Sequence, residues 1–300
     1  MAPRFLVVIA DDYGIGPETS RGILELAGRG VVTGTVLLVN SPHAADAVRA
    51  WRRSGVELEV GWHPNLVMDP PSAPPGRVRS LLGDDGCLLP LGRFLTRLGL
   101  QQIRPGDIER ELNAQLDRFI ELVGHEPAVV NAHQHTALFP PVGATLRRVL
   151  KRCAAPPYVR RVREPWAMLR AIPGARVKRA VLTVLGRYES WRQEVDGFPG
   201  NDWLAGITDP RWVKDPDFFV RWLTRVPGRV VELACHPGHP DPTLLGRDCR
   251  EGDGLLQRRV DELHLLNQPS FAAACRRAGF TRVTPSGLLA SGPRGLRHVA

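Results

Sequence analysis

Short apolar runs alternate with segments of helical spacing along almost the whole chain, and this alternation restricts the fold more than any other feature. Residues 5–10 form an apolar run typical of a buried strand, and residues 20–27 follow with helical spacing and a Gly-Arg-Gly stop. The same order recurs, with strands expected at 35–39, 58–62, 128–132, 158–162, 229–235 and near 280, and helices at 43–53, 107–123, 142–152, 217–225, 255–268 and 271–278. Strands that alternate with helices pair in parallel, so the sequence predicts an α/β protein.

The number of units favours a closed architecture. Seven or so strand–helix units without a Gly-rich GxGxxG loop indicate a distorted parallel β/α barrel of seven or eight strands rather than a doubly wound dinucleotide-binding fold. We found no repeat and no linker that divides the chain, so we expect one domain over residues 1–292 and a C-terminal tail at 293–300. Residues 64–105 and 164–215 interrupt the alternation and are expected to be insertions on barrel loops.

Composition excludes several classes of protein. The 300 residues are 43% hydrophobic and 24% charged, which is an ordinary globular mixture, and the apolar runs are far shorter than the roughly 20 residues of a membrane span. The first run meets two aspartates too early for a signal peptide, so we expect a cytoplasmic protein. Five scattered cysteines without a CxxC pair indicate neither a disulfide framework nor a thiolate zinc site.

Polar side chains directly follow four of the apolar runs. They are Asp11 and Asp12 after the first run, His63 and Asn65 after the third, Asn131, His133 and His135 after the fourth, and His236 after a late one. In a β/α barrel these strand ends share one rim, where active sites lie. Each signal alone is weak, because carboxylates also cap helices and single histidines are often structural. Two aspartates and four histidines at equivalent ends, in a chain with nine histidines, indicate a metal site.

Imidazole and carboxylate groups together suit a catalytic divalent ion held by three protein side chains, with a further position open. Asp12, His63 and His133 are the candidate ligands. Asp11 is then left as a general base, and His236, from a distant strand, as the group that protonates a leaving group.

Three further polar residues are expected near this rim. His135 should share a strand face with His133, because side chains alternate with period two, and either ligates the ion or contacts substrate or the ligands. Asn131 should point the same way. Asn65 is expected to bind substrate or to support the ligands.

Six motifs in this order resemble the YdjC-like carbohydrate deacetylases, a family that includes chitooligosaccharide deacetylases and a hopanoid-biosynthesis-associated branch. The matching stretches are ADDYG at 10–14, GVVTGT at 30–35 with Asn40 following, GWHPNL at 61–66, NAHQH at 131–135, ELACHPG at 232–238 and RVDEL at 259–263. The resemblance covers residues 5 to about 290. Two departures stand out: the Asp-Ser-His typical of the family is Asn131-Ala-His133 here, as in the hopanoid-associated branch, and Trp62 replaces a usual Leu.

The resemblance implies a β/α barrel that removes acetyl groups from N-acetylated sugars, releasing acetate and a free amino sugar. Its metal ligands fall on Asp12, His63 and His133, its base on Asp11 and its acid on His236. The resemblance points to Mg²⁺, whereas two histidines and one aspartate suit Zn²⁺ or another transition metal. The expected partner is an N-acetylated saccharide, with a phosphate- or lipid-linked form and a homodimer left open. The stretch 200–206 matches nothing with an assignable role.

The sequence is also compatible with two other functions. A glycosidase on the same barrel would use two carboxylates without a metal. Alternatively, residues 147–187 could bind nucleic acid or an anionic membrane surface. They carry twelve Lys and Arg and a single acid, so this segment has a net charge of +11, whereas the whole chain has a net charge of +9. We expect no nucleic-acid partner, because the acids and histidines at the rim would then have no purpose.

The basic stretch 158–187 has an amphipathic pattern with two interpretations. In the first, it is a helix packed on the barrel with a solvated face. In the second, it covers the rim and attracts an anionic acceptor such as a sugar on a phosphate-bearing lipid, with Arg176 and Arg179 among the binding residues.

Overall fold

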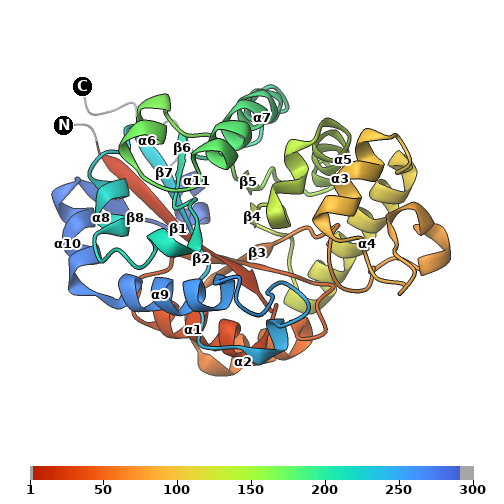
Figure 1. The fold of residues 1–300 in the computed structure, drawn as a ribbon, viewed down its shortest axis with the longest axis horizontal. Helices are drawn as coiled ribbons and strands as arrows, with labels where there is room; N and C mark the ends of the chain where they lie inside the picture. Colours follow the sequence, from red (N-terminus) through yellow and green to blue (C-terminus); the bar gives the residue numbers. More distant parts are fainter. Residues whose placement is uncertain (1–2, 291–300) are drawn as a thin grey trace.

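The computed structural model describes residues 3–290, which form one domain built on parallel strands (Figure 1). The strands are β1 (Arg4–Tyr13), β2 (Gly34–Leu37), β3 (Glu59–Trp62), β4 (Val129–Val130), β5 (Tyr158–Val159), β6 (Trp203–Ala205), β7 (Val230–Cys235) and β8 (Phe280–Arg282). The helices are α1 (Pro17–Gly28), α2 (Ala44–Ser54), α3 (Leu91–Gly99), α4 (Pro105–Val123), α5 (Pro140–Leu150), α6 (Trp166–Ala171), α7 (Arg176–Val195), α8 (Phe218–Leu223), α9 (Leu255–Asn267), α10 (Pro269–Arg277) and α11 (Pro285–Ala290). The predicted α/β class is confirmed.

The sheet order is β5-β4-β3-β2-β1-β7-β6, and every pairing is parallel. These seven strands curl into a half-barrel, and helices surround them (Figure 1). β1 is the longest strand and pairs along one edge with β7. Its other edge is shared, because β8 pairs with its first residues and β2 with its last. β1 is therefore the structural axis, and its residues from Leu6 onward are buried on both faces, as expected for a strand of a parallel sheet.

The two outer strands, β5 and β6, meet through a side chain instead of a strand ladder. The amide of Asn201 accepts from the backbone N–H of Arg161 at 2.8 Å and donates to the carbonyl of the same residue at 2.9 Å. Backbone bonds from Val159 to Pro199 and from Leu204 to Arg163 flank this contact. Asn201 is fully buried, and its amide makes the two hydrogen bonds that a backbone residue of a paired strand would otherwise make between β5 and β6.

Two expectations differ from the structure. β6 was missed, because this short strand lies inside the stretch 164–215 that was predicted to be an insertion. The strands predicted at 128–132 and 158–162 are only two residues long, because the chain leaves the sheet after Val130 and Val159. The stretch 200–206, which had no role in the sequence, supplies both Asn201 and β6. The tail predicted at 293–300 lies outside the described residues.

The insertion predicted at 64–105 contains two short 3₁₀ turns and α3. It folds back onto α4, where the Asp107 and Glu111 carboxylates accept from backbone N–H groups of residues 72, 73 and 80. Among residues 3–290, no helix is both long enough and apolar enough to cross a membrane.

We predict that Asn201→Ala lowers the free energy of unfolding by about 1–3 kcal/mol, because the part-buried N–H of Arg161 loses its partner and the Arg161 carbonyl keeps only the bond from the N–H of Arg163. Gln102→Ala, at an exposed position, is the matched control and should change stability little. Denaturant unfolding followed by circular dichroism measures both. Equal stability of the two variants would mean that the Asn201 amide does not stabilise the contact between β5 and β6.

Candidate active site

The adjacent carboxylates of Asp11 and Asp12 both reach one cavity because the end of β1 is irregular. Successive strand residues normally point to opposite faces. Here the register between β1 and β2 shifts between Ala10 and Tyr13, and Asp12 adopts φ 65°, in the left-handed region. A bulge of this kind re-aims side chains and often occurs beside functional sites.

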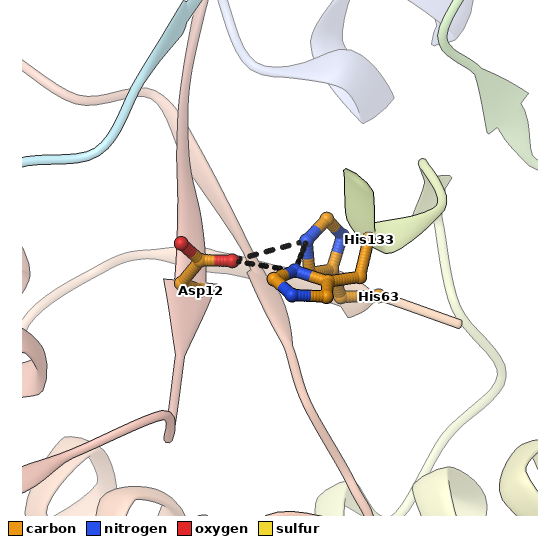
Figure 2. Close-up of side chains that lie close together, drawn as sticks. All are labelled: Asp12, His63 and His133. Atoms are coloured by element: carbon orange, nitrogen blue, oxygen red, sulfur yellow. Dashed lines mark hydrogen bonds and ion pairs between the residues drawn. The ribbon is translucent and has the colours of Figure 1, made fainter. Parts of the chain in front are cut away.

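Asp12, His63 and His133 converge, as Figure 2 shows. The Oδ1 atom of Asp12 lies 3.2 Å from Nε2 of His63 and 3.0 Å from Nδ1 of His133, and these two nitrogens are 3.3 Å apart. All three side chains are buried, and they come from the ends of β1 and β3 and from the turn after β4. The three residues predicted as ligands therefore lie together.

The donor set fits a metal ion. Nδ1 of His63 is 2.7 Å from the backbone carbonyl of Asn131, which can only accept, so this nitrogen carries the hydrogen and Nε2 presents its lone pair to the cluster. Nε2 of His133 is buried without a hydrogen-bond partner and faces Asp248 at 3.8 Å. One carboxylate oxygen and two imidazole nitrogens aimed at one point, with the His63 ring oriented by its bond to the Asn131 carbonyl, are what a divalent ion requires.

Arg259 on α9 fixes the charge of Asp12. Its Nη2 atom donates to Oδ2 of Asp12 at 2.7 Å and to Oδ2 of Asp248 at 2.8 Å. Burial alone would raise the pKa of Asp12, but the Arg259 guanidinium and the hydrogen bonds of His133 and His63 hold it well below its ordinary value. Asp12 is therefore ionised, with one oxygen held by Arg259 and the other facing the two histidines.

Arg160, the residue after β5, does the same for Asp11. Its two Nη atoms bond the two carboxylate oxygens at 2.6 and 2.7 Å, and its Nε atom donates to the buried Glu232 on β7. Burial would raise the pKa of Asp11, but Arg160 lowers it to about 2. Asn131 adds a bond to Oδ1 of Asp11 at 3.3 Å. Asp11 is held in one orientation and stays ionised.

His236 follows β7 and lies beside Asp11, with its Nε2 atom 3.7 Å from Oδ2. Its backbone N–H donates to Glu262, and its side chain is 30% exposed. Burial and the nearby Arg258 lower the pKa of His236, so the imidazole is mainly neutral at pH 7. Of the four predicted histidines, His63 and His133 belong to the cluster of potential ligands, and His135 and His236 do not.

A cavity of about 550 Å³ opens above these groups. Its floor is polar, with Asp11, Asp12, His63, His133, His236 and Asp248. Its walls are largely apolar and comprise Leu91, Leu95, Phe139, Val181, Leu182, Leu185, Ile207 and Leu255. A polar reacting group can therefore reach the floor while an apolar group contacts the walls.

Two expectations about neighbouring residues need correction. His135 does not share a strand face with His133 as predicted, because residues 133–138 form a 3₁₀ turn in which Gln134 and His135 have positive φ. His135 still lines the cavity, and burial lowers its pKa to about 3, so it is neutral. Asn65 is fully buried, and its amide bonds the carbonyl of Met68 and the N–H of Val67, so it holds the loop after β3 and does not line the cavity.

The basic segment also differs from expectation. Arg179 is buried and makes a two-pronged ion pair with Glu164, so it is not available to an anionic ligand, and the second interpretation of this segment is wrong for that residue. Arg160 belongs to the same segment and binds Asp11. Sequence reasoning missed Arg160, Glu232, Asp248 and Arg259 as members of the site, although Glu232 carries a signal, namely a carboxylate inside a buried strand.

Comparison with known proteins identifies the family of this chain. The model of the YdjC-like protein family matches residues 5–277. The chain belongs to this family. A carbohydrate deacetylase of Geobacillus stearothermophilus is 30% identical over 283 residues, covering 94% of this chain and 97% of its own. A chitooligosaccharide deacetylase of Klebsiella pneumoniae is 29% identical over 279 residues, covering 92% and 96%, and a mouse carbohydrate deacetylase is 32% identical over 291 residues, covering 89% of each.

Among solved structures, an Enterococcus faecalis V583 protein whose description refers to cellobiose-phosphate cleavage superposes with a TM-score of 0.77. It is 21% identical, and the match covers 96% of this chain and 99% of that one. The likeness supports the fold.

We predict that Arg160→Gln lowers the free energy of unfolding by about 3–5 kcal/mol, because it leaves two buried carboxylates, Asp11 and Glu232, without their cation. The control is Arg148→Gln, whose exposed pairing with Glu109 contributes less than about 1 kcal/mol. Thermal and denaturant unfolding would test this difference. Similar losses in both variants would show that the Arg160 contacts are not the main support of the two carboxylates.

Proposed function

We propose that this protein is a metal-dependent carbohydrate N-deacetylase that hydrolyses the acetamide of an N-acetylated saccharide to acetate and a free amino sugar. The observation that carries the proposal is the convergence of Asp12, His63 and His133 beside the ionised Asp11. The relatives that match nearly the whole chain are named carbohydrate or chitooligosaccharide deacetylases, which supports the same reaction class.

Asp12, His63 and His133 would hold one divalent ion, which when bound supplies Lewis acidity that polarises the acetyl carbonyl and acidifies water. Family resemblance favours Mg²⁺. The donors, two nitrogens and one oxygen, instead favour Zn²⁺ or another transition metal, because Mg²⁺ prefers an all-oxygen shell. Assays of protein stripped of metal and reloaded with each ion decide between them.

Asp11 is proposed as the general base. Arg160 keeps it ionised and points both oxygens in fixed directions, so a carboxylate is always available to take a proton from the attacking water. Its low pKa makes it a weak base, and the proton therefore passes on readily. Nε2 of His236, 3.7 Å away in the cavity floor, is the proposed acceptor of that proton.

His236 is proposed as the general acid. Because its pKa is lowered, it begins the reaction neutral and can receive that proton before protonating the departing amine. Asn131 and His135 are proposed to position the reacting groups, the first through Asp11 and His63 and the second from the cavity wall.

The apolar walls support a substrate whose sugar is attached to an apolar group, such as a lipid-linked sugar. The glycosidase alternative is less well supported. That reaction needs one protonated carboxylic acid with a raised pKa, whereas Asp11 and Asp12 both have lowered values.

The experiment is a panel of N-acetylated saccharides, free and linked to alkyl chains, assayed for released acetate with and without chelator. We expect acetate release that chelation abolishes. Asp11→Asn and His236→Gln should retain bound metal by elemental analysis and lose about 10²- to 10⁴-fold in turnover, since neither could then move a proton. Chelator-resistant activity, or near-normal turnover in either variant, would contradict the proposal.

A further inference from the structure

Helix α7 carries an exposed apolar stripe. Its members lie four and three residues apart in alternation, so they share one helical face. They are Val177, Val181, Val184, Tyr188, Trp191 and Val195, and between 49% and 81% of each is exposed. We call these six residues the α7 stripe. Single exposed apolar residues are ordinary, but a continuous row of this length indicates an interaction surface.

The stripe is fixed in its outward orientation by the opposite face of the helix. That inner face is polar and buried, with Arg179 paired to Glu164 and Glu189 paired to Arg147. Gly186 lies so close to the carbonyl of Val162 that a Cβ atom there would be only 1.6 Å from it. Rotating α7 to bury the stripe would break both ion pairs and this close packing, so no other part of this chain covers the stripe among the described residues.

The charges beside the stripe point to an anionic partner. Arg176, Lys178, Arg187 and Arg192 flank it, and in the described part of the chain none of the four makes an ion pair with a carboxylate. The acid on this side, Glu194, is already engaged by Arg163. The flanks are therefore positive along the whole helix.

The same charges disfavour a second copy of this chain. An antiparallel pairing centred on the stripe would place Arg187 next to its own symmetry mate and Lys178 near Arg192. A parallel pairing would place Arg187 near Arg192. Both orientations bring like charges together beside the apolar seam, and like charges at such positions oppose pairing.

We propose that the α7 stripe docks on an anionic lipid bilayer surface. Valines can enter the acyl boundary, Tyr188 and Trp191 have the amphipathic rings that favour the interface, and the flanking cations meet lipid phosphates. Trp166 on α6 is also exposed and lies under Arg187, with 5.4 Å between the guanidinium and the ring, which extends the aromatic part of this face.

The position of the stripe gives the docking a consequence for the active site. Val181 is 52% exposed and also lines the cavity, and the neighbouring Leu182 and Leu185 form part of its wall. The apolar surface therefore continues from the stripe into the cavity, so a docked protein holds the cavity mouth at the level of the lipid headgroups. The docking surface itself does not depend on the proposed deacetylation.

The test is flotation of the full chain with vesicles of phosphatidylcholine alone or mixed with phosphatidylglycerol. We expect binding to the anionic vesicles that weakens as salt is raised. Val184→Glu/Trp191→Glu should reduce this binding about ten-fold or more. The matched control is Leu100→Glu, which places the same charge at a 62% exposed leucine outside the stripe and should bind as the unaltered chain does.

Unfolding curves of the variants verify that each is folded, and light scattering reports the oligomeric state. Equal loss in the stripe variant and the Leu100→Glu control would overturn the proposal, as would the absence of vesicle binding by the unaltered chain. A dimer that the stripe variant converts to monomer would also overturn it and assign the face to a second copy. Acetate release plays no part in these readouts, so their failure is distinct from failure of the proposed function.

Discussion

Two adjacent buried carboxylates at the end of β1 are the constraint on which the rest of the structure depends. Ionised aspartates inside a protein are stable only when cations and hydrogen bonds compensate for lost solvation. Asp11 receives Arg160 from the segment after β5, and Asp12 receives Arg259 from α9. Each arginine also binds a second carboxylate, Glu232 for Arg160 and Asp248 for Arg259. The charges of the cavity floor are therefore balanced by residues distant in sequence.

The closure of the half-barrel and the position of the proposed base are parts of one arrangement. Arg160 precedes the residue whose backbone N–H and carbonyl are bound by Asn201, so the contact that joins β5 to β6 also holds the chain that presents Arg160 to Asp11. Helix α7 covers the same region, with Gly186 against Val162. Its inner polar face belongs to this support, which explains why the six residues of the α7 stripe are left outside.

The sequence predicts the parallel α/β architecture and the convergence of Asp12, His63 and His133 well, because both depend on local order. Asp12, His63 and His133 follow apolar runs, and strand ends of a β/α barrel meet at one rim. The same rule wrongly placed Asn65 at the cavity. The Asn65 amide instead forms hydrogen bonds within the loop after β3. The same rule missed Arg160 as a site residue, although Arg160 also follows a strand. The predicted strand extended to residue 162, so Arg160 was placed inside it, and the many cations nearby indicated a solvated face. Asp248 reaches the site through tertiary packing, for which no local pattern exists. Arg259 opens the matching stretch 259–263, but its partner Asp12 is distant in sequence and no role could be assigned to it.

X-ray absorption spectroscopy of the protein loaded with one equivalent of Zn²⁺ tests the central claim most directly, because it reports the ligands themselves. The account predicts two imidazole nitrogens and a carboxylate oxygen at about 2.0–2.2 Å, with one imidazole lost in His133→Ala and no imidazole lost in His135→Ala. A bound ion without imidazole ligands, or one whose spectrum is the same in His133→Ala, would contradict the assignment of Asp12, His63 and His133 as a metal site.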